Sequence, residues 1–480
     1  MSGSLPVNRR RGDYRDTPGP VLCSDLHSVE VGCGATKSLC KLLSAKKDPR
    51  VRIGFFSDRY LPFTDGIACS MEDARRELED LGHEVYIFAP KPDRRYCEQA
   101  PRVTRFPAVK GICFDDYRFS VFYPPRARRQ IDRLELDLVH FHTPGQIGVF
   151  GAYYAHRHDL PLVTTYHTDL YEYVTHYPGV LPGVVALSIL APYVTGGGAG
   201  ERRISRSCVR PERSIDRWNQ KVVERGMTLI HNSCDLVITP SAKMTAQLGG
   251  WNTTSRIATL PSGVDEIPST PAAVAAARRA HGIAEDDEVV LFVGRIGSEK
   301  NLSLLIDAFE HVAARRERAR LLLIGPGDED GGFRERAAAT ACADRITFTG
   351  RMNRADLGAY YELADVFAFP STADTQALVV NEAAWAGTPV VMVDRNISQI
   401  VEDGVSGLFA AATPEGFAER ISALLGDPDR AAAMGRAGRE RAAKLTARIQ
   451  AAKLARLYEE TAGGYVPRLP AQYAAVPAAA

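Results

Sequence analysis

The stretch Val289-Val-Leu-Phe-Val-Gly-Arg-Ile-Gly-Ser-Glu-Lys-Asn301 joins an apolar strand to a turn, and an amphipathic helix over Leu302–Ala314 follows it. A second apolar run, Leu321–Ile324, comes directly after that helix. A strand, a helix and a strand in this order predict parallel strands covered by helices, because the crossover helix must pack on the sheet. The sequence therefore predicts an α/β fold class.

The same alternation continues on both sides of this unit. Further strands are predicted downstream at Ile346–Thr349, Val366–Phe369 and Pro389–Val393. Strands are predicted upstream at Val51–Ser57, Glu84–Ala89, Leu136–Phe141, Leu160–Tyr166 and Asp235–Thr239. The helical periodicity of Ser70–Leu81 ends at Gly82, a residue suited to a left-handed helix stop.

Two strand–helix series of similar size predict two Rossmann-like domains that face each other across a cleft. The Pro- and Ala-rich stretch Gly263–Ala277 is the natural linker between them. We predict a disordered extension over 1–48, an N-terminal domain over 49–265 and a C-terminal domain over 278–443. A helix over 444–462 should cross back to the N-terminal domain, and 463–480 should form a loose tail.

The composition is that of an ordinary soluble globular protein. Of the 480 residues, 45% are hydrophobic and 24% are charged, and the net charge of +1 gives no general attraction to nucleic acid. The nine Cys form no C-x-x-C pair, which argues against a zinc site or a disulfide framework. The N-terminus lacks an apolar signal core, and no apolar run approaches the ~20 residues of a membrane span. We expect a cytoplasmic protein with reduced thiols.

One segment, residues 195–225, is strongly basic. It holds eight Arg and Lys against four Asp and Glu, a net charge of +4. A solvated surface loop and helix is the simpler interpretation, and contact with an anionic membrane surface or an acidic acceptor is the other. Arg126, Arg128 and Arg129 could add to such a contact.

The turn after the Val289–Val293 strand carries two cations, Arg295 and Lys300. Ligands of open α/β sheets bind beyond the carboxyl ends of the strands, so these cations should lie at the mouth of the cleft. Fixed cations there can stabilise the negative charge of a departing nucleoside diphosphate without a metal ion.

A second group follows the Val366–Phe369 strand. Asp374 lies in the loop, where its carboxylate can accept a hydrogen bond from a sugar hydroxyl, and Glu382 lies further along the next helix, where it can bind a ribose. The backbone amides near Ala377–Val379 are expected to point outward from a helix N-terminus, which favours a phosphate.

At this point the chain resembles glycosyltransferase family 4, a family of retaining enzymes with the GT-B fold. The resemblance covers about residues 51–460 and rests on the ordered motifs Phe292–Asn301, Phe348-Thr-Gly-Arg-Met352, Ala364-Asp-Val-Phe-Ala-Phe-Pro-Ser371 and Asp374…Glu382-Ala-Ala-Trp-Ala-Gly-Thr-Pro-Val-Val391. In the N-terminal half, Tyr60-Leu-Pro-Phe-Thr-Asp-Gly66, His142-Thr-Pro144 and Thr165-Tyr-His167 look closest to the diacylglycerol glucosyltransferases and related lipid-directed members.

The resemblance implies a role for each matching residue. Gly66 would let backbone amides approach the diphosphate or the donor sugar, and His167 would contact the sugar and orient the reacting groups as a catalytic residue together with Asp374. The remaining donor contacts would come from Arg295, Lys300, Arg351, Met352, Thr375, Gln376, Ala377, Leu378, Val379 and Glu382. The resemblance implies neither a cofactor nor a metal site, because GT-B enzymes use protein cations instead.

Two departures from the family pattern bear on donor preference. The first acidic position is Asp374 where many members have Glu, and the Gly-rich loop has the single glycine Gly66, preceded by Asp65. His140 and His142 flank the strand end next to that of His167, and the sequence does not rank them.

The leading hypothesis is a retaining hexosyltransferase that uses a nucleoside diphosphate sugar, UDP-glucose first and GDP-mannose second. Its acceptor is a membrane lipid such as diacylglycerol, or a soluble molecule such as a sugar phosphate or a small thiol precursor. A lipid acceptor would place the enzyme at the inner face of the cell membrane. The alternative is a GT-B protein that transfers no sugar, such as a nucleotide-sugar epimerase or a sugar-nucleotide-binding subunit.

Overall fold

The computed structural model describes residues 50–463, except for 94, 99, 111–117, 121–122, 178, 180, 195, 197–214 and 328–330. The predictions for the extension 1–48 and for the tail beyond 463 lie outside these residues, as does most of the basic segment. All of the elements below belong to one compact unit, Pro49–Ala480.

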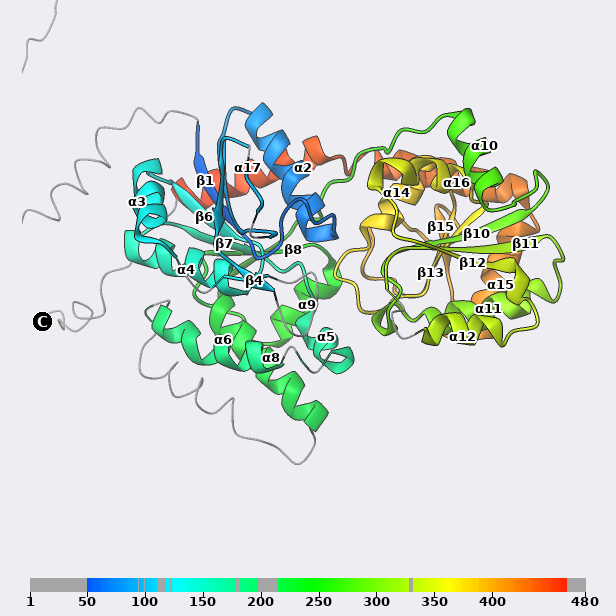
Figure 1. Ribbon diagram of the computed structural model, residues 1–480, viewed down its shortest axis with the longest axis horizontal. Coiled ribbons are helices and arrows are strands. Elements are labelled where there is room, and N and C mark those ends of the chain that lie inside the picture. Colours follow the sequence, from blue (N-terminus) through cyan, green and yellow to red (C-terminus); the bar gives the residue numbers. More distant parts are fainter. Residues whose placement is uncertain are drawn as a thin grey trace, which may run out of the picture. The chain divides into compact units, whose positions relative to one another are not determined.

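A seven-stranded parallel sheet forms the centre of the N-terminal domain (Figure 1). Its strand order is β3-β2-β1-β6-β7-β8-β9. The strands are β1 Arg52–Phe56, β2 Glu84–Pro90, β3 Val103–Phe106, β6 Leu138–Phe141, β7 Leu162–Thr165, β8 Leu236–Thr239 and β9 Arg256–Thr259. A short antiparallel hairpin, β4 Val109–Lys110 and β5 Arg118–Phe119, stands apart from this sheet. The helices are α2 Gly66–Asp80, α3 Pro125–Leu134, α4 Gln146–His158, α5 Leu170–His176, α6 Leu181–Val194, α8 Ile215–His231 and α9 Ala242–Gly250.

Side-chain alternation along the strands builds an apolar core on each face of this sheet. In β1, Ile53 and Phe55 pack into the cluster that contains α2, whereas Phe56 packs into the cluster that contains α4 and α8. Successive side chains of a strand point to opposite faces, and a parallel sheet buries both of them. The continuous apolar runs in the sequence follow from this double burial.

A six-stranded parallel sheet forms the centre of the C-terminal domain, in the order β12-β11-β10-β13-β14-β15. The strands are β10 Glu288–Val293, β11 Ala319–Ile324, β12 Ile346–Gly350, β13 Val366–Phe369, β14 Val390–Met392 and β15 Gly407–Phe409. The helices are α10 Pro271–Ala280, η2 Ser298–Lys300, α11 Leu302–Ala313, α12 Gly332–Ala338, η3 Ala343–Arg345, η4 Arg354–Asp356, α13 Leu357–Leu363, α14 Leu378–Ala386, α15 Pro414–Leu425 and α16 Pro428–Ala442. Helices cover both faces of this sheet (Figure 1).

The two connections between the domains run against each other. A side chain at Gly263 would bring its Cβ within 2.4 Å of the Ala447 Cα, so only glycine fits in the first connection there. Asp265 accepts a hydrogen bond from the Ala447 amide, at the start of the last helix, α17 Ala447–Gly463. That helix packs against α2, and its Tyr458 is fully buried beneath the N-terminal sheet. In the described part of the chain, no helix has both the length and the apolar character needed to cross a bilayer.

Two expectations are wrong in detail. Residues 271–277 of the expected linker Gly263–Ala277 belong to α10, because Thr270 caps that helix at the Ala273 amide and Pro271 occupies its first turn. The first helix begins at Gly66 rather than at Ser70, because the Asp65 side chain accepts from the Ala68 amide. Gly66 is therefore the first helical residue and not a loop residue.

In each sheet, the first strands are added toward one edge and the later strands toward the other, so there is one switch point between the two halves. In the N-terminal sheet it lies between β1 and β6, and in the C-terminal sheet it lies between β10 and β13. Open parallel sheets bind ligands at such points, beyond the carboxyl ends of the strands. The fold therefore predicts ligand-binding residues in the segments that follow β1, β6, β10 and β13.

Candidate functional site

The residues predicted from the sequence follow strands at or next to these points. Asp65 and Gly66 come after β1, and His167 comes after β7. In the C-terminal domain, Arg295 and Lys300 follow β10, while Asp374 to Glu382 follow β13. Arg351 and Met352 follow the edge strand β12. Because the strands are parallel, all of these segments lie at the carboxyl edges of the two sheets.

Lys300 and Asp374 form an ion pair. The Lys300 Nζ lies 2.6 Å from the Asp374 Oδ1, and fewer than one fifth of either side chain is exposed. The other carboxylate oxygen, Oδ2, is buried and has no hydrogen-bond partner among the described residues. A buried carboxylate oxygen needs a donor, so the Oδ2 is suited to accept a hydrogen bond from a ligand hydroxyl.

Arg295 lies in an aromatic and acidic environment. Its Nη2 is 2.7 Å from the Glu299 Oε1, and its guanidinium lies over the rings of Tyr173 and Tyr177. The Tyr177 hydroxyl donates to the Glu299 Oε2 at 2.7 Å. Tyr173 belongs to α5 and Tyr177 directly follows it, so the N-terminal domain contributes to the surroundings of this cation. Sequence reasoning missed both tyrosines.

The first turn of α14 offers backbone donors without a side-chain cap. Its preceding residue, Ala377, makes no capping hydrogen bond, whereas the start of α2 is capped by the Asp65 carboxylate. The two helix starts approach each other, since a Cβ added at Gly66 would lie 3.5 Å from the Leu378 Cδ1. The Leu378 and Val380 amides already donate to the Gln376 and Ala377 carbonyl oxygens, so the helix dipole and the Val379 amide are what the start of α14 offers an anion. The Asp65 charge makes the start of α2 less suited to one.

The loop before α14 contacts the N-terminal domain through two predicted residues. The Thr375 hydroxyl donates to the His167 carbonyl oxygen at 2.8 Å. The Gln376 side chain accepts from the Ser262 amide and donates to the Ser262 carbonyl oxygen. Both side chains thus bind the N-terminal domain, and the site is built from both domains.

Glu382 is buried and held by two donors. Its Oε1 accepts from the Arg354 Nε at 3.0 Å, and its Oε2 accepts from the Tyr361 hydroxyl at 2.7 Å. The Arg354 Nη1 also lies 3.4 Å from the Asp73 Oδ2 on α2, which ties the carboxylate to the N-terminal domain. Arg354 lies at the start of η4, two residues beyond the Phe348–Met352 motif, and sequence reasoning missed it.

Arg351 and Met352 lie just beyond the left-handed Gly350 at the end of β12. Arg351 is exposed, while Met352 is half-buried against the core of the C-terminal domain. This pair therefore lies beside the sheet edge, with Met352 offering an apolar surface.

Three histidines gather at the carboxyl ends of β6 and β7. The His140 Nδ1 lies 2.6 Å from the Tyr458 hydroxyl and its Nε2 lies 2.9 Å from the Thr165 hydroxyl, so both of its ring nitrogens are used structurally. The His142 Nδ1 lies 3.0 Å from the His167 Nε2. The structure thus separates the roles of the two other histidines: His142 contacts His167, whereas His140 stabilises the core.

Burial keeps these histidines uncharged near neutral pH. It lowers the pKa of His167 to about 4, although the Asp65 charge opposes the shift. Burial also lowers the pKa of His142 well below its ordinary value, and the neighbouring His140 and His167 lower it further. Neutral rings can exchange hydrogen bonds with a ligand, but they cannot supply a positive charge.

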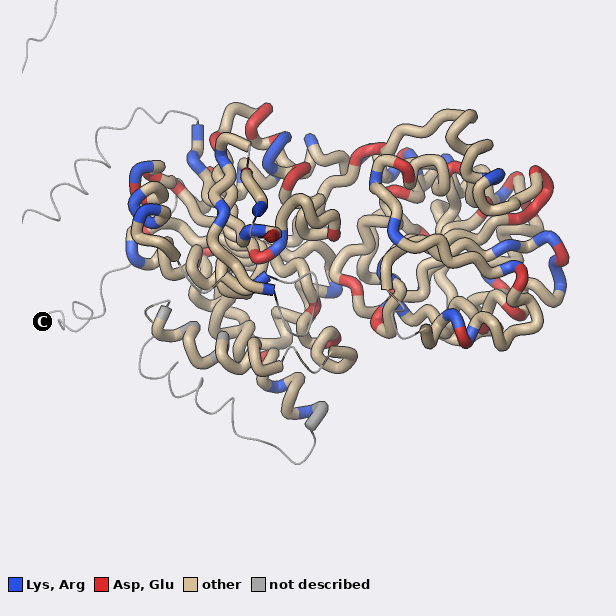
Figure 2. Tube along the Cα trace, in the orientation of Figure 1, with Lys and Arg blue, Asp and Glu red and all other residues tan. Residues whose placement is uncertain are grey.

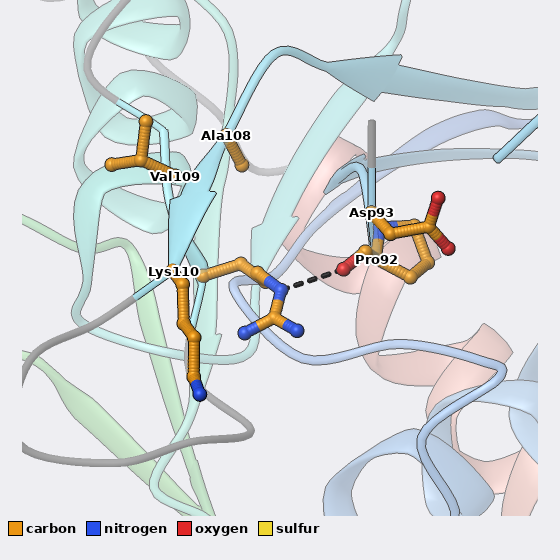
Figure 3. Close-up of a pocket in the computed structure, with 6 residues that line it drawn as sticks. Pro92, Asp93, Ala108, Val109 and Lys110 are labelled. Atoms are coloured by element: carbon orange, nitrogen blue, oxygen red, sulfur yellow. Dashed lines mark hydrogen bonds between the residues drawn. The ribbon is translucent and has the colours of Figure 1, made fainter. Parts of the chain in front are cut away.

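A separate cavity of about 250 Å³ lies between the loop after β2 and the β4–β5 hairpin (Figure 3). Pro92, Asp93, Ala108, Val109, Lys110 and Arg118 line it. The Arg118 Nε donates to the Pro92 carbonyl oxygen at 2.6 Å. None of the predicted site residues lines this cavity, so it is distinct from the candidate site described above.

Basic and apolar side chains are exposed on three helices of the N-terminal domain, α3, α4 and α6. Arg126, Arg128 and Arg129 are exposed on α3, which appears as a blue segment in Figure 2. His158 of α4 pairs with Asp132 of α3, and α4 packs against α6. Large apolar side chains exposed on α4 and α6 are Tyr153, Ile189, Leu190 and Tyr193. The sequence indicated the arginines and missed the apolar residues.

Comparison with known proteins bears on these features. The model described as Glycosyltransferase Family 4 matches residues 64–266, and that described as Glycosyl transferases group 1 matches residues 274–441. An alpha-monoglucosyldiacylglycerol synthase of Acholeplasma laidlawii is 30% identical over 367 residues, 75% of this chain and 84% of that protein. The enzyme of the same name from Streptococcus pneumoniae is 26% identical over 387 residues, 79% of each chain.

Solved structures show the same fold at lower identity. The Anabaena protein HepE, solved in complex with UDP-glucose, matches with a TM-score of 0.61 at 16% identity and covers 86% of this chain and all of its own. The predicted fold class and family resemblance are confirmed. The chain belongs to glycosyltransferase family 4: it is a glycosyltransferase with the GT-B fold, and it is similar along most of its length to the monoglucosyldiacylglycerol synthases.

Proposed function

We propose that the enzyme is a retaining hexosyltransferase that moves glucose from UDP-glucose to a hydroxyl of a membrane lipid, diacylglycerol first among them. GDP-mannose is the second candidate donor. The observation that carries the proposal is the convergence of Lys300, Arg295 and the uncapped start of α14 at one carboxyl edge. Two cations and the positive end of a helix dipole favour the binding of a diphosphate.

The other predicted residues take donor roles around that diphosphate, except Thr375 and Gln376, whose side chains bind the N-terminal domain. Glu382 accepts hydrogen bonds from the ribose, and Arg351 with Met352 lies beside the base. Asp374, through its unpaired Oδ2, and His167 hold hydroxyls of the transferred sugar. Gly66 keeps the start of α2 close to the sugar and the diphosphate without a side chain between them.

The proposed reaction is a front-face displacement at the anomeric carbon. The acceptor hydroxyl forms the new carbon–oxygen bond on the side from which the diphosphate leaves, so the configuration is retained. Its proton passes to the departing phosphate oxygen, and the bond from the anomeric carbon to that oxygen breaks. Lys300, Arg295 and the N-terminus of α14 stabilise the charge that accumulates on the leaving group, and the reaction needs no divalent cation.

The acceptor assignment rests on the names of two relatives, each a monoglucosyldiacylglycerol synthase matched over at least three quarters of this chain. A soluble acceptor, such as a sugar phosphate or a small thiol precursor, remains the alternative to be tested. A protein that binds or epimerises the donor without transferring its sugar is the second candidate.

A transfer assay tests this assignment directly. The full chain is incubated with UDP-glucose or GDP-mannose, in EDTA, with diacylglycerol vesicles or with soluble acceptors, and the product is analysed by NMR spectroscopy. We expect an α-linked glucosyl lipid from UDP-glucose, formed equally well in EDTA. An epimerised donor without transfer would establish the second candidate, and a β-linked product would refute retention.

We further propose that the enzyme works as a peripheral protein on the cytoplasmic face of an anionic membrane. The exposed arginines of α3 supply attraction to acidic headgroups, and the exposed Ile189, Leu190 and Tyr193 of α6 supply apolar area for insertion. Basic residues near an anionic surface contribute about 1 kcal/mol each, and buried apolar area adds to this.

Vesicle binding provides a measurable prediction for this surface. Changing Arg126, Arg128 and Arg129 together to Gln should weaken binding to phosphatidylglycerol-rich vesicles at low salt by roughly 100-fold. The same change at the exposed Arg315, Arg318 and Arg436 of the C-terminal domain is the matched control. Equal losses in both variants, or wild-type binding that is insensitive to salt, would contradict the proposed surface.

A further inference from the structure

The two ring nitrogens at which His142 and His167 meet share a single proton, which belongs to one ring or the other. The His142 Nδ1 and the His167 Nε2 are 3.0 Å apart, which is hydrogen-bond distance. Both rings are neutral, so each carries a single N–H. Either His142 donates from Nδ1 and His167 presents its own N–H at Nδ1, or His167 donates from Nε2 and His142 carries its N–H at Nε2.

The second nitrogen of His142 decides between these arrangements. His142 is 4% exposed as a residue, and its Nε2 is buried with no hydrogen-bond partner in the described part of the chain. If this atom carried the proton, a buried N–H would be left without an acceptor. Orphaned buried N–H groups are rarer than under-satisfied acceptors, so the arrangement with a bare Nε2 is favoured.

The packing around His142 holds its ring in this position. Phe55 packs edge-on against it with ring centroids 4.5 Å apart, and the ring centroid of His140, in β6 just before His142, lies 4.0 Å away. His140 is itself fixed by Tyr458 and Thr165. The ring of His142 is therefore locked, and it can impose its hydrogen-bond polarity on His167.

We infer that His142 is a positioning residue: its Nδ1–H donates to the His167 Nε2 and so fixes His167 as the tautomer that carries its proton on Nδ1. The hydrogen bond at one ring nitrogen determines which tautomer the other nitrogen presents. His167 is partly exposed, and no described residue accepts from its Nδ1. That nitrogen is left as a donor for an oxygen of the bound sugar or phosphate.

This assignment limits what His167 can do. Its Nε2 lone pair is occupied by His142, so the ring cannot take a proton from the acceptor hydroxyl through that atom. His167 acts as a hydrogen-bond donor to the ligand, in agreement with proton transfer to the departing phosphate. The functional consequence rests on the proposed glycosyl transfer, whereas the tautomer itself does not.

Substitutions that mimic one ring nitrogen at a time separate the two tautomers. Asparagine places its amide near the position of Nδ1, and glutamine places it near that of Nε2. We expect His142→Asn to preserve the donor to His167, whereas His142→Gln and His142→Leu lose it. His83→Leu is the matched control, because His83 is also buried and accepts from the Val51 amide at the opposite, amino end of the sheet.

The tautomer is read from ¹⁵N spectra of histidine-labelled protein, with the His167 signals assigned by their loss in His167→Gln. The expected result is a protonated Nδ1 and an unprotonated Nε2 in the wild type and in His142→Asn, and a changed tautomer ratio in His142→Gln. A wild-type His167 protonated at Nε2, or identical ratios in His142→Asn and His142→Gln, would overturn the inference. Should His142→Leu not fold, the Asn and Gln pair still gives the answer.

Activity provides the second readout. We expect turnover to fall about 10- to 100-fold in His142→Gln, the size of loss seen when a group that orients a metal-binding histidine is removed. A smaller loss is expected in His142→Asn, and little change in His83→Leu. A Gln variant as active as the Asn variant would contradict the positioning role. If the tautomer changes as expected while the protein shows no transfer at all, the proposed function fails and the hydrogen-bond assignment stands.

Discussion

Lys300→Ala is expected to lower turnover by about 10²- to 10³-fold. The departing diphosphate gains negative charge in the transition state. Lys300 follows β10, which pairs with β13, and its side chain is mostly buried, so its charge is little screened by water. Removing one preorganised donor from such a site typically costs this much. Because the charge develops during the reaction, the loss should fall mainly on kcat rather than on the KM for the donor.

The ion pair with Asp374 complicates this variant, since alanine also leaves that carboxylate without a partner. Lys300→Arg restores the pair and the charge, so it should recover part of the activity. Arg336→Ala is the control, because it breaks an exposed ion pair with Asp307 and should leave turnover unchanged. Near-normal turnover in Lys300→Ala, with a folded protein, would remove the basis of the proposed diphosphate site.

Much of this site was predictable because it depends on strand order. Apolar runs broken by turns identified the strands β10 and β13, and parallel strands place their carboxyl ends together. It follows that Lys300 and Asp374, 74 residues apart in the chain, lie at one edge. The resemblance to the family motifs independently indicated the same two residues.

What the sequence could not predict are contacts that depend on how the two domains meet. Arg354 and Asp73 are 281 residues apart, and neither lies in a motif. Tyr177 and Glu299 are likewise joined only in the folded chain. The rank of His140 and His142 was also unpredictable, because it depends on Tyr458 from the last helix reaching His140 and not His142.

Local capping explains the errors in element bounds. Apolar periodicity located the first helix at Ser70, but Asp65 accepts from the Ala68 amide and starts the helix at Gly66. Thr270 does the same for α10, where Pro and Ala had suggested a linker. In both cases a single hydrogen bond to a free amide adds residues that carry no apolar pattern.

Glu382→Ala is expected to raise the KM for the donor by about 10- to 100-fold while changing kcat little. A carboxylate has about four acceptor positions, so Glu382 can bind two ribose hydroxyls while it keeps its contacts with Arg354 and Tyr361. Hydrogen bonds to a charged group contribute about 1.5–3 kcal/mol. The ribose does not change during the reaction, so its binding should be equal in the ground state and the transition state.

Arg354→Met tests whether the arginine acts through this carboxylate. The single variant should raise the KM because Glu382 loses the donor that orients it, and the double variant with Glu382→Ala should be no worse than Glu382→Ala alone. Asp73→Asn weakens the contact of Arg354 with α2, and the ion pair of Asp73 with Arg76, but leaves the contact between Arg354 and Glu382 in place. It therefore separates the link between the domains from the orientation of the carboxylate. Additive losses in the double variant would mean that Arg354 binds the donor independently, and an unchanged KM in Glu382→Ala would place the ribose elsewhere.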